Sequence, residues 1–257
     1  MQDLYCSSHL LNAMQPLPNP RVLIFEEIDS TNLEARRRFL EGDSGYTLLL
    51  ANRQTAGRGR LGRSFHSPSA GIYLSLLAPI DPGELVPSIG VTCAASVAVM
   101  RAIAETTGKQ TQIKWVNDLY HNGKKVCGIL TEAVTMGARA ALIIGIGINL
   151  RPTCFPAELQ KIAGSLNNTT ASKTQVVSAL LRQLIPYLTD PKNHGWLEDY
   201  RTASCVLGKS VTWTENGVSN TGIAQSINEE GALSVCDSNG CLHLLRTGEI
   251  SLRTVDP

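Results

Sequence analysis

Short apolar runs alternate with stretches of helical periodicity along residues 21–202, and this mixture predicts a domain that contains both strands and helices. Four apolar runs are typical of buried strands: Val22–Phe25, Tyr46–Ala51, Ile72–Ala78 and Ala140–Ile148. Three longer segments are expected to be helices: residues 32–40, 86–107 and 173–188. Residues 196–200 continue the helical texture.

Local signals place the ends of several elements. Thr31 and Glu34 have the spacing of a capping box, which predicts the start of the first helix. The pair Asn122–Gly123 favours a two-residue β-hairpin turn, and we expect it to join residues 119–120 to a strand over residues 125–133.

The pattern changes after about Ala203, where the expected strands become short and closely spaced. Five strands are predicted: Val211–Trp213, Gly222–Ile227, Leu233–Cys236, Leu242–Leu245 and Ile250–Leu252. Turn-prone pairs such as Glu230–Gly231 and Asn239–Gly240 separate them. Residues 203–257 are therefore expected to form a small SH3-like barrel.

Residues 1–20 contain three prolines and show no clear periodicity, so we expect a loose arm. This arm leaves no room for a helix-turn-helix DNA-binding domain before residue 21. The expected organisation is an arm over 1–20, a large domain over 21–202 and the small module over 203–257.

Composition narrows the class of protein. A hydrophobic fraction of 43% and a charged fraction of 18% are those of an ordinary globular protein, and the formal net charge of +1 argues against a general nucleic-acid binder. The seven cysteines include no CxxC pair, so neither a zinc site nor a redox motif is expected. We see no signal peptide, and Thr92, Ser96 and Arg101 interrupt the longest apolar stretch. These features predict a cytoplasmic protein without a membrane span.

The segment Gln54–Arg63 carries the most specific chemical signal. Three glycines and three arginines interleave within the seven residues 57–63. Glycine lets the backbone approach a ligand closely, and arginine is suited to carboxylates and phosphates. The alternative is a solvated loop or an unspecific nucleic-acid contact. The apolar runs on either side favour an anion-binding site for a small ligand.

Four further motifs accompany this segment in a fixed order. The five motifs are Ser30–Asn32, Gln54–Arg63, Lys114–Asp118, Lys125–Leu130 and Gly145–Asn149. Together they resemble the successive motifs of biotin protein ligases, which attach biotin to a carboxylase carrier subunit. The resemblance implies an α+β fold: a mixed-sheet catalytic domain flanked by helices, of the class II synthetase-like or biotin-lipoate ligase type, with the small C-terminal barrel. It also implies the form of the family without an N-terminal DNA-binding domain.

The resemblance implies a biotin site, and the neutral ureido ring of biotin needs paired donors and acceptors. The implied biotin-binding residues are Ser30, Thr31, Asn32, Gln54, Gly57, Arg58, Gly59, Arg60, Lys125, Gly128, Gly145 and Gly147. Helix capping is a second role for the first two of these residues, and strand packing is the alternative for the last three glycines.

The resemblance also implies a nucleotide site. Arg60 is expected to contact the phosphate and close the loop, while Arg63 contacts the nucleotide or merely supports the loop. Phe65 fits as a platform for adenine, where many relatives have tryptophan, and Val116 replaces a common proline. The other implied nucleotide-binding residues are Asn117 and Asn149, and we expect no metal-binding cluster.

Lys125 is the lysine that the resemblance marks as catalytic, together with Arg60 and Asp118. An ammonium beside the reacting carboxylate and α-phosphate would stabilise the charge of the transition state. Lys114 is the competitor for this role, and Lys124 is expected on the other face. Asp118 would orient or deprotonate the incoming lysine of the carrier, or it is a turn residue.

The resemblance implies an ATP-dependent ligase whose substrates are biotin, MgATP and the biotin carboxyl carrier protein of acetyl-CoA carboxylase. DNA and membranes are not expected partners, and some members form homodimers by extending their sheets. One alternative is a lipoate or octanoate ligase or transferase, which would have no use for the run of polar residues at 30–32. Another is a nonenzymatic biotin-sensing regulator.

Overall fold

The computed structural model describes residues 4–81, 88–190, 192–215, 217–246 and 250–252. Its larger part is built on a seven-stranded sheet with the order β1-β2-β3-β7-β6-β5-β4. The strands are β1 Arg21–Ile28, β2 Thr47–Gln54, β3 Ile72–Ile80, β4 Gln112–Lys114, β5 Asp118–His121, β6 Lys124–Met136 and β7 Arg139–Ile148. The pair β1 and β2 is parallel and the other neighbours are antiparallel, so the sheet is mixed, as predicted.

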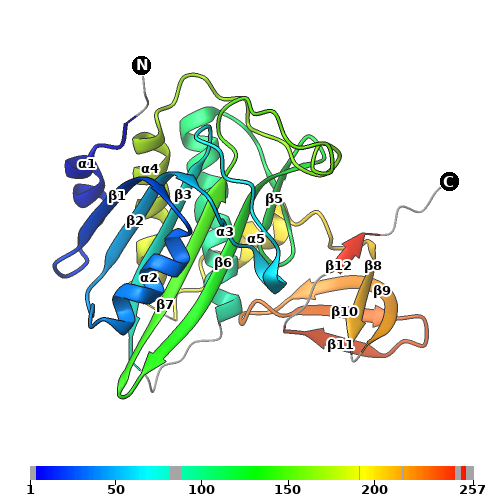
Figure 1. Cartoon of the computed structure of the whole chain (residues 1–257). Coiled ribbons are helices and arrows are strands. Elements are labelled where there is room, and N and C mark those ends of the chain that lie inside the picture. The colour runs from blue at the N-terminus through cyan, green and yellow to red at the C-terminus, as the bar shows by residue number, and fades with distance from the viewer. Residues whose placement is uncertain (1–3, 82–87, 191, 216, 247–249, 253–257) are drawn as a thin grey trace.

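Helices cover the two faces of this sheet unequally (Figure 1). Helix α2 (Thr31–Leu40) lies on one face, and helices α3 (Ser88–Thr107), α4 (Lys173–Thr189) and α5 (Leu197–Ala203) lie on the other. The side chains of β7 alternate accordingly: Ile144 and Ile146 belong to the large core with α3 and α4, whereas Ile143 packs with Phe39 of α2. Because α2 is short, part of its face of the sheet is left open.

The strand predicted at Val22–Phe25 forms as β1, but the expectation that it is buried is wrong. β1 lies at the edge of the sheet, and Ile24 is 39% exposed. The predicted capping box is also wrong. The N-cap of α2 is Ser30, and Glu34 pairs with Arg37 and Arg38 instead.

The expected loose arm contains a docked helix, which corrects the prediction for residues 1–20. Helix α1 (Ser7–Ala13) packs beside α4, as Figure 1 shows. Leu10, Met14 and Leu17 are buried in the large core. Burial of these apolar side chains holds the segment against the domain despite its prolines.

Helix α3 contains the stretch Ile89–Thr107, which is long and apolar enough to cross a membrane by those two criteria alone. More than half of that stretch is buried inside the protein, against α4 and the sheet. Its apolar character is therefore explained by its place in the core. The expected start of this helix at Val86 lies outside the described residues.

The five strands predicted after Ala203 are all present. They are β8 Ser210–Glu215, β9 Val218–Ile227, β10 Leu233–Asp237, β11 Leu242–Leu245 and β12 Ile250–Leu252. They form a separate antiparallel sheet with the order β11-β10-β9-β8-β12. Residues 253–257 of the expected module lie outside the described part of the chain. Trp115 ties the module to the large domain, because its indole N–H donates to the carbonyl of Gly231 at 2.9 Å.

Candidate functional site

A cavity of about 390 Å³ opens on the face of the sheet that α2 covers only in part. Residues of all five motifs line it, although more than a hundred residues separate the first motif from the last. Of the residues predicted for the site, the cavity is lined by Ser30, Thr31, Asn32, Gln54, Arg58, Gly59, Arg60, Arg63, Phe65, Asn117, Asp118, Lys125, Gly128, Gly145, Gly147 and Asn149. Gly57, which belongs to the same loop, does not line it.

Strand register sets two rows of residues across the sheet, and Leu130, Gly145, Gly128 and Gly147 of these rows line the cavity. In the first row, Ser75 of β3 lies opposite Gly145 of β7, which lies opposite Leu130 of β6. In the second row, Gly147 lies between Tyr73 and Gly128 in the same way. Both glycines of β7 point to the same face, because successive strand residues alternate.

The glycines of these rows make room for two side chains of the protein. A Cβ atom at Gly145 would lie 2.0 Å from Asn32 Oδ1, and one at Gly147 would lie 2.5 Å from the ring of Phe65. The same ring is 3.2 Å from the Cβ position at Gly128. The first row therefore holds an amide and the second holds an aromatic ring.

A hydrogen-bonded network surrounds the first row. Thr31 N–H donates to Gln54 Oε1 at 2.9 Å, and Gln54 Nε2 donates to the hydroxyl of Ser67 at 3.0 Å. The buried Ser75 hydroxyl lies 2.5 Å from Asn32 Oδ1 and 2.8 Å from Thr31 Oγ1. These contacts engage the Thr31 hydroxyl, so the predicted capping box lacks the hydroxyl that would have accepted a backbone N–H. They also fix the polar groups on this wall before any ligand arrives.

The arginine- and glycine-rich loop is folded back on itself above the second row. Arg58 and Ser64 form an isolated antiparallel bridge, and the Gly59 N–H donates to the carbonyl of Arg63 at 2.7 Å. Gly62 takes a φ of 74°, which favours glycine. Gly57 has a steric role, because a Cβ atom there would lie 2.5 Å from the carbonyl oxygen of Phe65.

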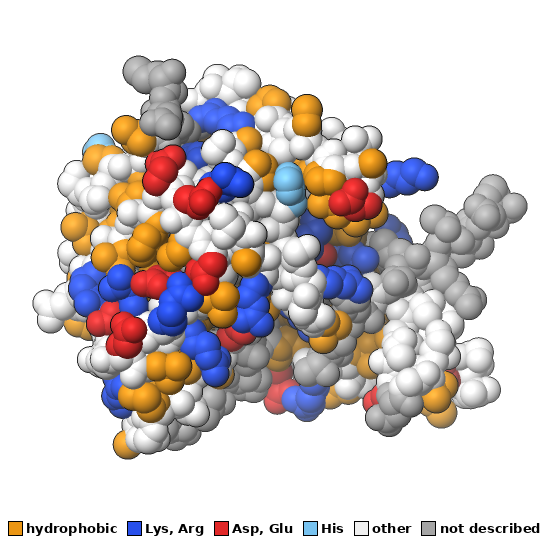
Figure 2. Space-filling model, viewed as in Figure 1, with side chains coloured by type: hydrophobic (Ala, Val, Ile, Leu, Met, Phe, Trp, Pro, Cys, Tyr) orange, Lys and Arg blue, Asp and Glu red, His pale blue; other side chains and the backbone are white. Residues whose placement is uncertain are grey.

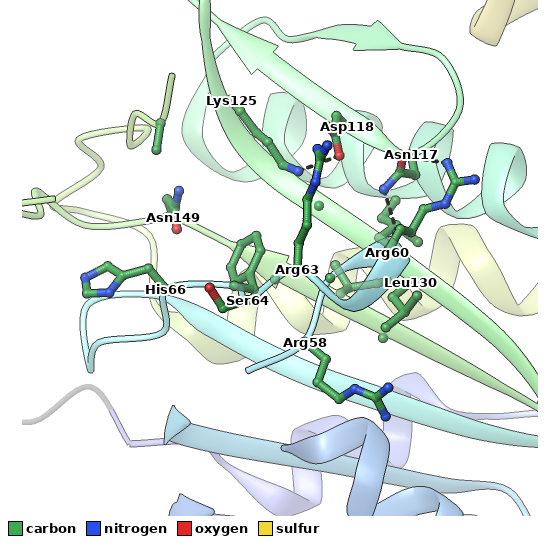
Figure 3. Close-up of a pocket in the computed structure, with 18 of the residues that line it drawn as sticks. Arg58, Arg60, Arg63, Ser64, His66, Asn117, Asp118, Lys125, Leu130 and Asn149 are labelled. Carbon is green, nitrogen blue, oxygen red and sulfur yellow. Dashed lines mark hydrogen bonds and ion pairs between the residues drawn. The ribbon is translucent and has the colours of Figure 1, made fainter. Parts of the chain in front are cut away.

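The three arginines of the loop point in different directions (Figure 3). Arg60 reaches across the cavity and donates to Asn117 Oδ1 at 3.2 Å. Arg63 points toward Lys125 and Asp118, whereas Arg58 points away from that pair. Arg60 therefore contacts a predicted nucleotide-binding residue, and Arg63 faces two predicted catalytic residues.

Lys125 and Asp118 form an ion pair at the same end of the cavity. Lys125 Nζ lies 2.7 Å from Asp118 Oδ1, and the two side chains are 31% and 21% exposed. Lys125 follows the predicted hairpin turn, and its N–H donates to the carbonyl of Ile162 at 2.9 Å. Asp118 is the first residue of β5 and not a turn residue. The ammonium is thus held in place by the strand and by its carboxylate partner.

Lys114, the competitor of Lys125, also lines the cavity. Its Nζ lies 5.9 Å from the ring centre of Tyr120, a cation–π contact. Burial, together with the nearby Asp118 carboxylate, raises the pKa of Tyr120 to about 12.

Asn149 and Trp115 hold loops around the site. Asn149 Nδ2 donates to the carbonyl of Gly164 at 2.9 Å, which fastens the loop after β7 beside Lys125. The peptide bond between Trp115 and Val116 is cis, and the Tyr200 hydroxyl donates to the Val116 carbonyl at 3.1 Å. The segment that carries Asn117 and Asp118 is thus supported from α5 as well as from the C-terminal module.

Several residues around the cavity were missed by the sequence analysis. They are Ser75 and Glu132 in the polar network, and His66, Phe155 and Ile250 in the lining. Ile250 comes from β12, so the C-terminal module contributes to the wall. A serine or glutamate within a strand gives no local signal of its partners, because register and helix placement decide them.

Charged side chains outside the cavity are mixed in sign on the face shown in Figure 2. Around α2, Arg37 pairs with Asp29 and Glu34, and Arg53 of β2 pairs with Glu27. Hydrogen bonding to Arg37 lowers the pKa of Asp29. Among the described residues, no group of three or more His, Cys, Asp or Glu side chains is placed to hold a metal ion.

Comparison with known proteins places this geometry in a family. Residues 24–149 match the model of the biotin/lipoate A/B protein ligase family. The chain is 36% identical over 217 residues to the bifunctional ligase/repressor BirA of Bacillus subtilis, covering 80% of this chain and 66% of that relative. It is 31% identical over 221 residues to the biotin–[acetyl-CoA-carboxylase] ligase of Paracoccus denitrificans, covering 80% of this chain and 90% of that protein.

A solved structure agrees with these sequence relatives. The biotin protein ligase from Aquifex aeolicus in complex with biotin and ATP superposes with a TM-score of 0.76 at 29% identity, and the match covers 91% of this chain and 98% of that one. The expected fold class is therefore confirmed. The chain belongs to the biotin/lipoate A/B protein ligase family, among its biotin protein ligases.

Proposed function

We propose that this protein activates biotin with MgATP as biotinyl-AMP and transfers the biotinyl group to a lysine of the biotin carboxyl carrier protein of acetyl-CoA carboxylase. The observation that carries the proposal is the cavity, where a polar wall at Thr31, Asn32 and Gln54 adjoins a cationic end at Lys125, Arg60 and Arg63. A neutral polar ring and a pair of anions fit these two ends.

The chemistry explains why both ends are needed. A carboxylate does not acylate an amine at neutral pH, because its oxygen is a poor leaving group. In the first step a biotin carboxylate oxygen attacks the α-phosphorus of ATP, and pyrophosphate leaves. In the second step the carrier lysine amine attacks the acyl carbon, and AMP leaves with the bonding electrons. A proton departs from the amine.

Lys125 is proposed to stabilise the charge of the first transition state. Its ammonium is oriented by Asp118 at 2.7 Å, so little reorganisation is needed when the phosphate arrives. Asp118 is proposed to receive or orient the amine of the carrier lysine in the second step. Asn117 and Asn149 are proposed to face the phosphates of the MgATP substrate, and their amide oxygens suit Mg²⁺ as ligands.

The remaining residues are proposed to bind and enclose the substrates. Ser30, Thr31, Asn32 and Gln54 bind the ureido ring, and Phe65 supports the adenine. Arg58 and Gly59 bind the acyl end of biotin, and Arg60 closes the loop over the phosphate. Closure of the loop would exclude water, which otherwise hydrolyses the mixed anhydride.

A lipoate or octanoate ligase is the second candidate, because the family includes such enzymes. A linear acyl chain would leave the polar groups of the Thr31 and Asn32 wall without partners, which opposes binding. A nonenzymatic biotin sensor would need the polar wall, but it would not need the ion pair of Lys125 and Asp118 at the other end of the cavity. The cavity therefore favours the biotin-activating enzyme.

The deciding experiment mixes the purified protein with biotin, MgATP and a biotin carrier domain. We expect release of pyrophosphate and a mass increase on one lysine of the carrier. Transfer of lipoate or octanoate without transfer of biotin would contradict the ligand assignment. Biotin binding without pyrophosphate release would indicate a sensor.

Location and assembly are also proposals. Seven free cysteines fit a reducing compartment such as the cytoplasm. The net charge of +1 and the mixed charges on the surface shown in Figure 2 do not favour DNA as a binding partner. The exposed edge of β1 would allow a homodimer with continuous sheets, which light scattering tests directly.

A further inference from the structure

Glu132 on β6 has no part in the steps above, yet a chain of hydrogen bonds connects it to the wall of the cavity. We propose that Glu132, acting through Asn32 and Ser75, fixes the hydrogen-bond direction at Thr31 and so makes the wall select a ligand N–H group. This inference rests on the proposed function, because the ligand group in question is a ureido N–H of biotin.

The chain begins with the amide of Asn32. Asn32 Nδ2 donates to Glu132 Oε2 at 2.9 Å, and the carbonyl of Leu130 lies 3.4 Å from the same nitrogen. An ionised carboxylate and a carbonyl can only accept hydrogen bonds. The nitrogen end of the amide must therefore face Glu132, and the oxygen end must face Ser75.

Ser75 passes this direction on. Its hydroxyl has one proton and is fully buried, 2.5 Å from Asn32 Oδ1. Because an amide oxygen only accepts, the proton of Ser75 goes to Asn32. Ser75 then offers Thr31 a lone pair at 2.8 Å.

Thr31 completes the chain at the cavity. Its own proton is drawn inward, either to Ser75 Oγ at 2.8 Å or to Gln54 Oε1 at 3.2 Å. The oxygen of Thr31 can then only accept a hydrogen bond from a ligand. A ligand with an N–H at this position is favoured, whereas a ring oxygen would place two lone pairs against each other.

The substitution Glu132→Gln removes the constraint without changing the shape of the side chain. A glutamine amide can donate as well as accept, so the Asn32 amide is free to reverse. A reversed Asn32 would donate to Ser75, and the Ser75 proton would turn toward Thr31. The Thr31 proton would then lose Ser75 as an acceptor, and only Gln54 Oε1 at 3.2 Å would compete with the ligand for it.

The test measures dissociation constants by calorimetry for biotin and for both isomers of an analogue with a ring oxygen in place of one ureido N–H. We expect the wild-type protein to prefer biotin strongly over at least one isomer. In Glu132→Gln this preference should fall roughly ten- to hundredfold, the range of one charge-assisted hydrogen bond. The KM for ATP should not change.

Two further variants make the result interpretable. Ser75→Ala interrupts the chain without touching Glu132 and should reduce the same preference. Glu27→Gln removes a carboxylate that pairs with Arg53 at the surface, and it should leave the preference unchanged.

An unchanged preference in both Glu132→Gln and Ser75→Ala would overturn the inference. An equal loss of affinity for biotin and for the analogues would also overturn it, because that result indicates a packing role. A wild-type protein that does not bind biotin would instead refute the proposed function itself.

Discussion

Gly145→Ala should disable the proposed biotin-binding wall at Thr31, Asn32 and Gln54, because Asn32 occupies the space that the new methyl group needs. The Cβ atom would lie 2.0 Å from Asn32 Oδ1, 2.7 Å from its Cγ and 2.9 Å from its Nδ2. Ordinary contacts of a Cβ atom begin near 3.4 Å, so the amide must move by about 1 Å or more.

The cost follows from the contacts that this shift breaks. Asn32 would lose its hydrogen bonds with Ser75 and with Glu132, at 2.5 and 2.9 Å. A neutral buried hydrogen bond contributes about 1 kcal/mol and one to a charged group about 1.5–3 kcal/mol. We expect the free energy of unfolding to fall by about 2–4 kcal/mol. The displaced amide would intrude on the ligand, and biotin affinity should fall on the order of a hundredfold.

The assay compares three alanine variants by denaturant unfolding and by calorimetry with biotin and with ATP. Gly45→Ala is the matched control, because the nearest atom to its Cβ position is 4.0 Å away. Gly147→Ala displaces Phe65 and should weaken ATP binding more than biotin binding. Wild-type biotin affinity in Gly145→Ala would refute the reasoning. Equal effects of Gly145→Ala and Gly147→Ala on both ligands would refute the assignment of biotin to the Asn32 row and of ATP to the Phe65 row.

Three other predictions concern the cationic end and its supports. Lys125→Ala should slow single-turnover adenylate formation on the order of 10²–10³-fold with the fold intact, and a near wild-type rate would remove this lysine from the chemistry. Arg60→Gly should loosen the loop and release biotinyl-AMP, so that an unrelated protein incubated with biotin and ATP becomes labelled; no labelling above wild type would mean that Arg60 is not a lid residue. Trp115→Phe removes the indole N–H that donates to Gly231 and should destabilise the protein by about 1–3 kcal/mol in urea unfolding, and unchanged stability would show that the module is held by other contacts.

The sequence predicted most of the elements, because each has a local cause. The helical face of α4 and the turn at Asn122–Gly123 are set by residues within a few positions of each other. The helix of the N-terminal arm, Ser7–Ala13, was not predicted. The segment is short and contains three prolines, and the partner that buries its apolar side chains is α4, far along the chain.

The candidate site divides in the same way. Ordered motifs predicted which residues would meet in the cavity, and the structure brings nearly all of them to its lining. Ser75 and Glu132 could not be predicted, because their partner Asn32 is 43 and 100 residues away. The role of Gly145 depends on the same long-range packing. A glycine at position 145 could serve either the close approach of a ligand or the packing of the Asn32 amide. Only the folded structure shows that it makes room for Asn32.

The proposed contacts of the Asn32 row with biotin and of the Phe65 row with adenine would bend the biotinyl-AMP intermediate. Gly145 and Gly147 are two residues apart on β7, which separates the Asn32 row from the Phe65 row by about 7 Å along the strand. If the biotin ring contacts Asn32 and the adenine contacts Phe65, as proposed, the intermediate would not lie extended along the sheet. In the proposed binding mode its acyl-phosphate centre would rise from the sheet toward Arg60, Arg63 and Lys125, which line the same cavity. The bend would bring the two anionic groups of the reaction together at the cations, so that the binding of both ends helps to offset their repulsion.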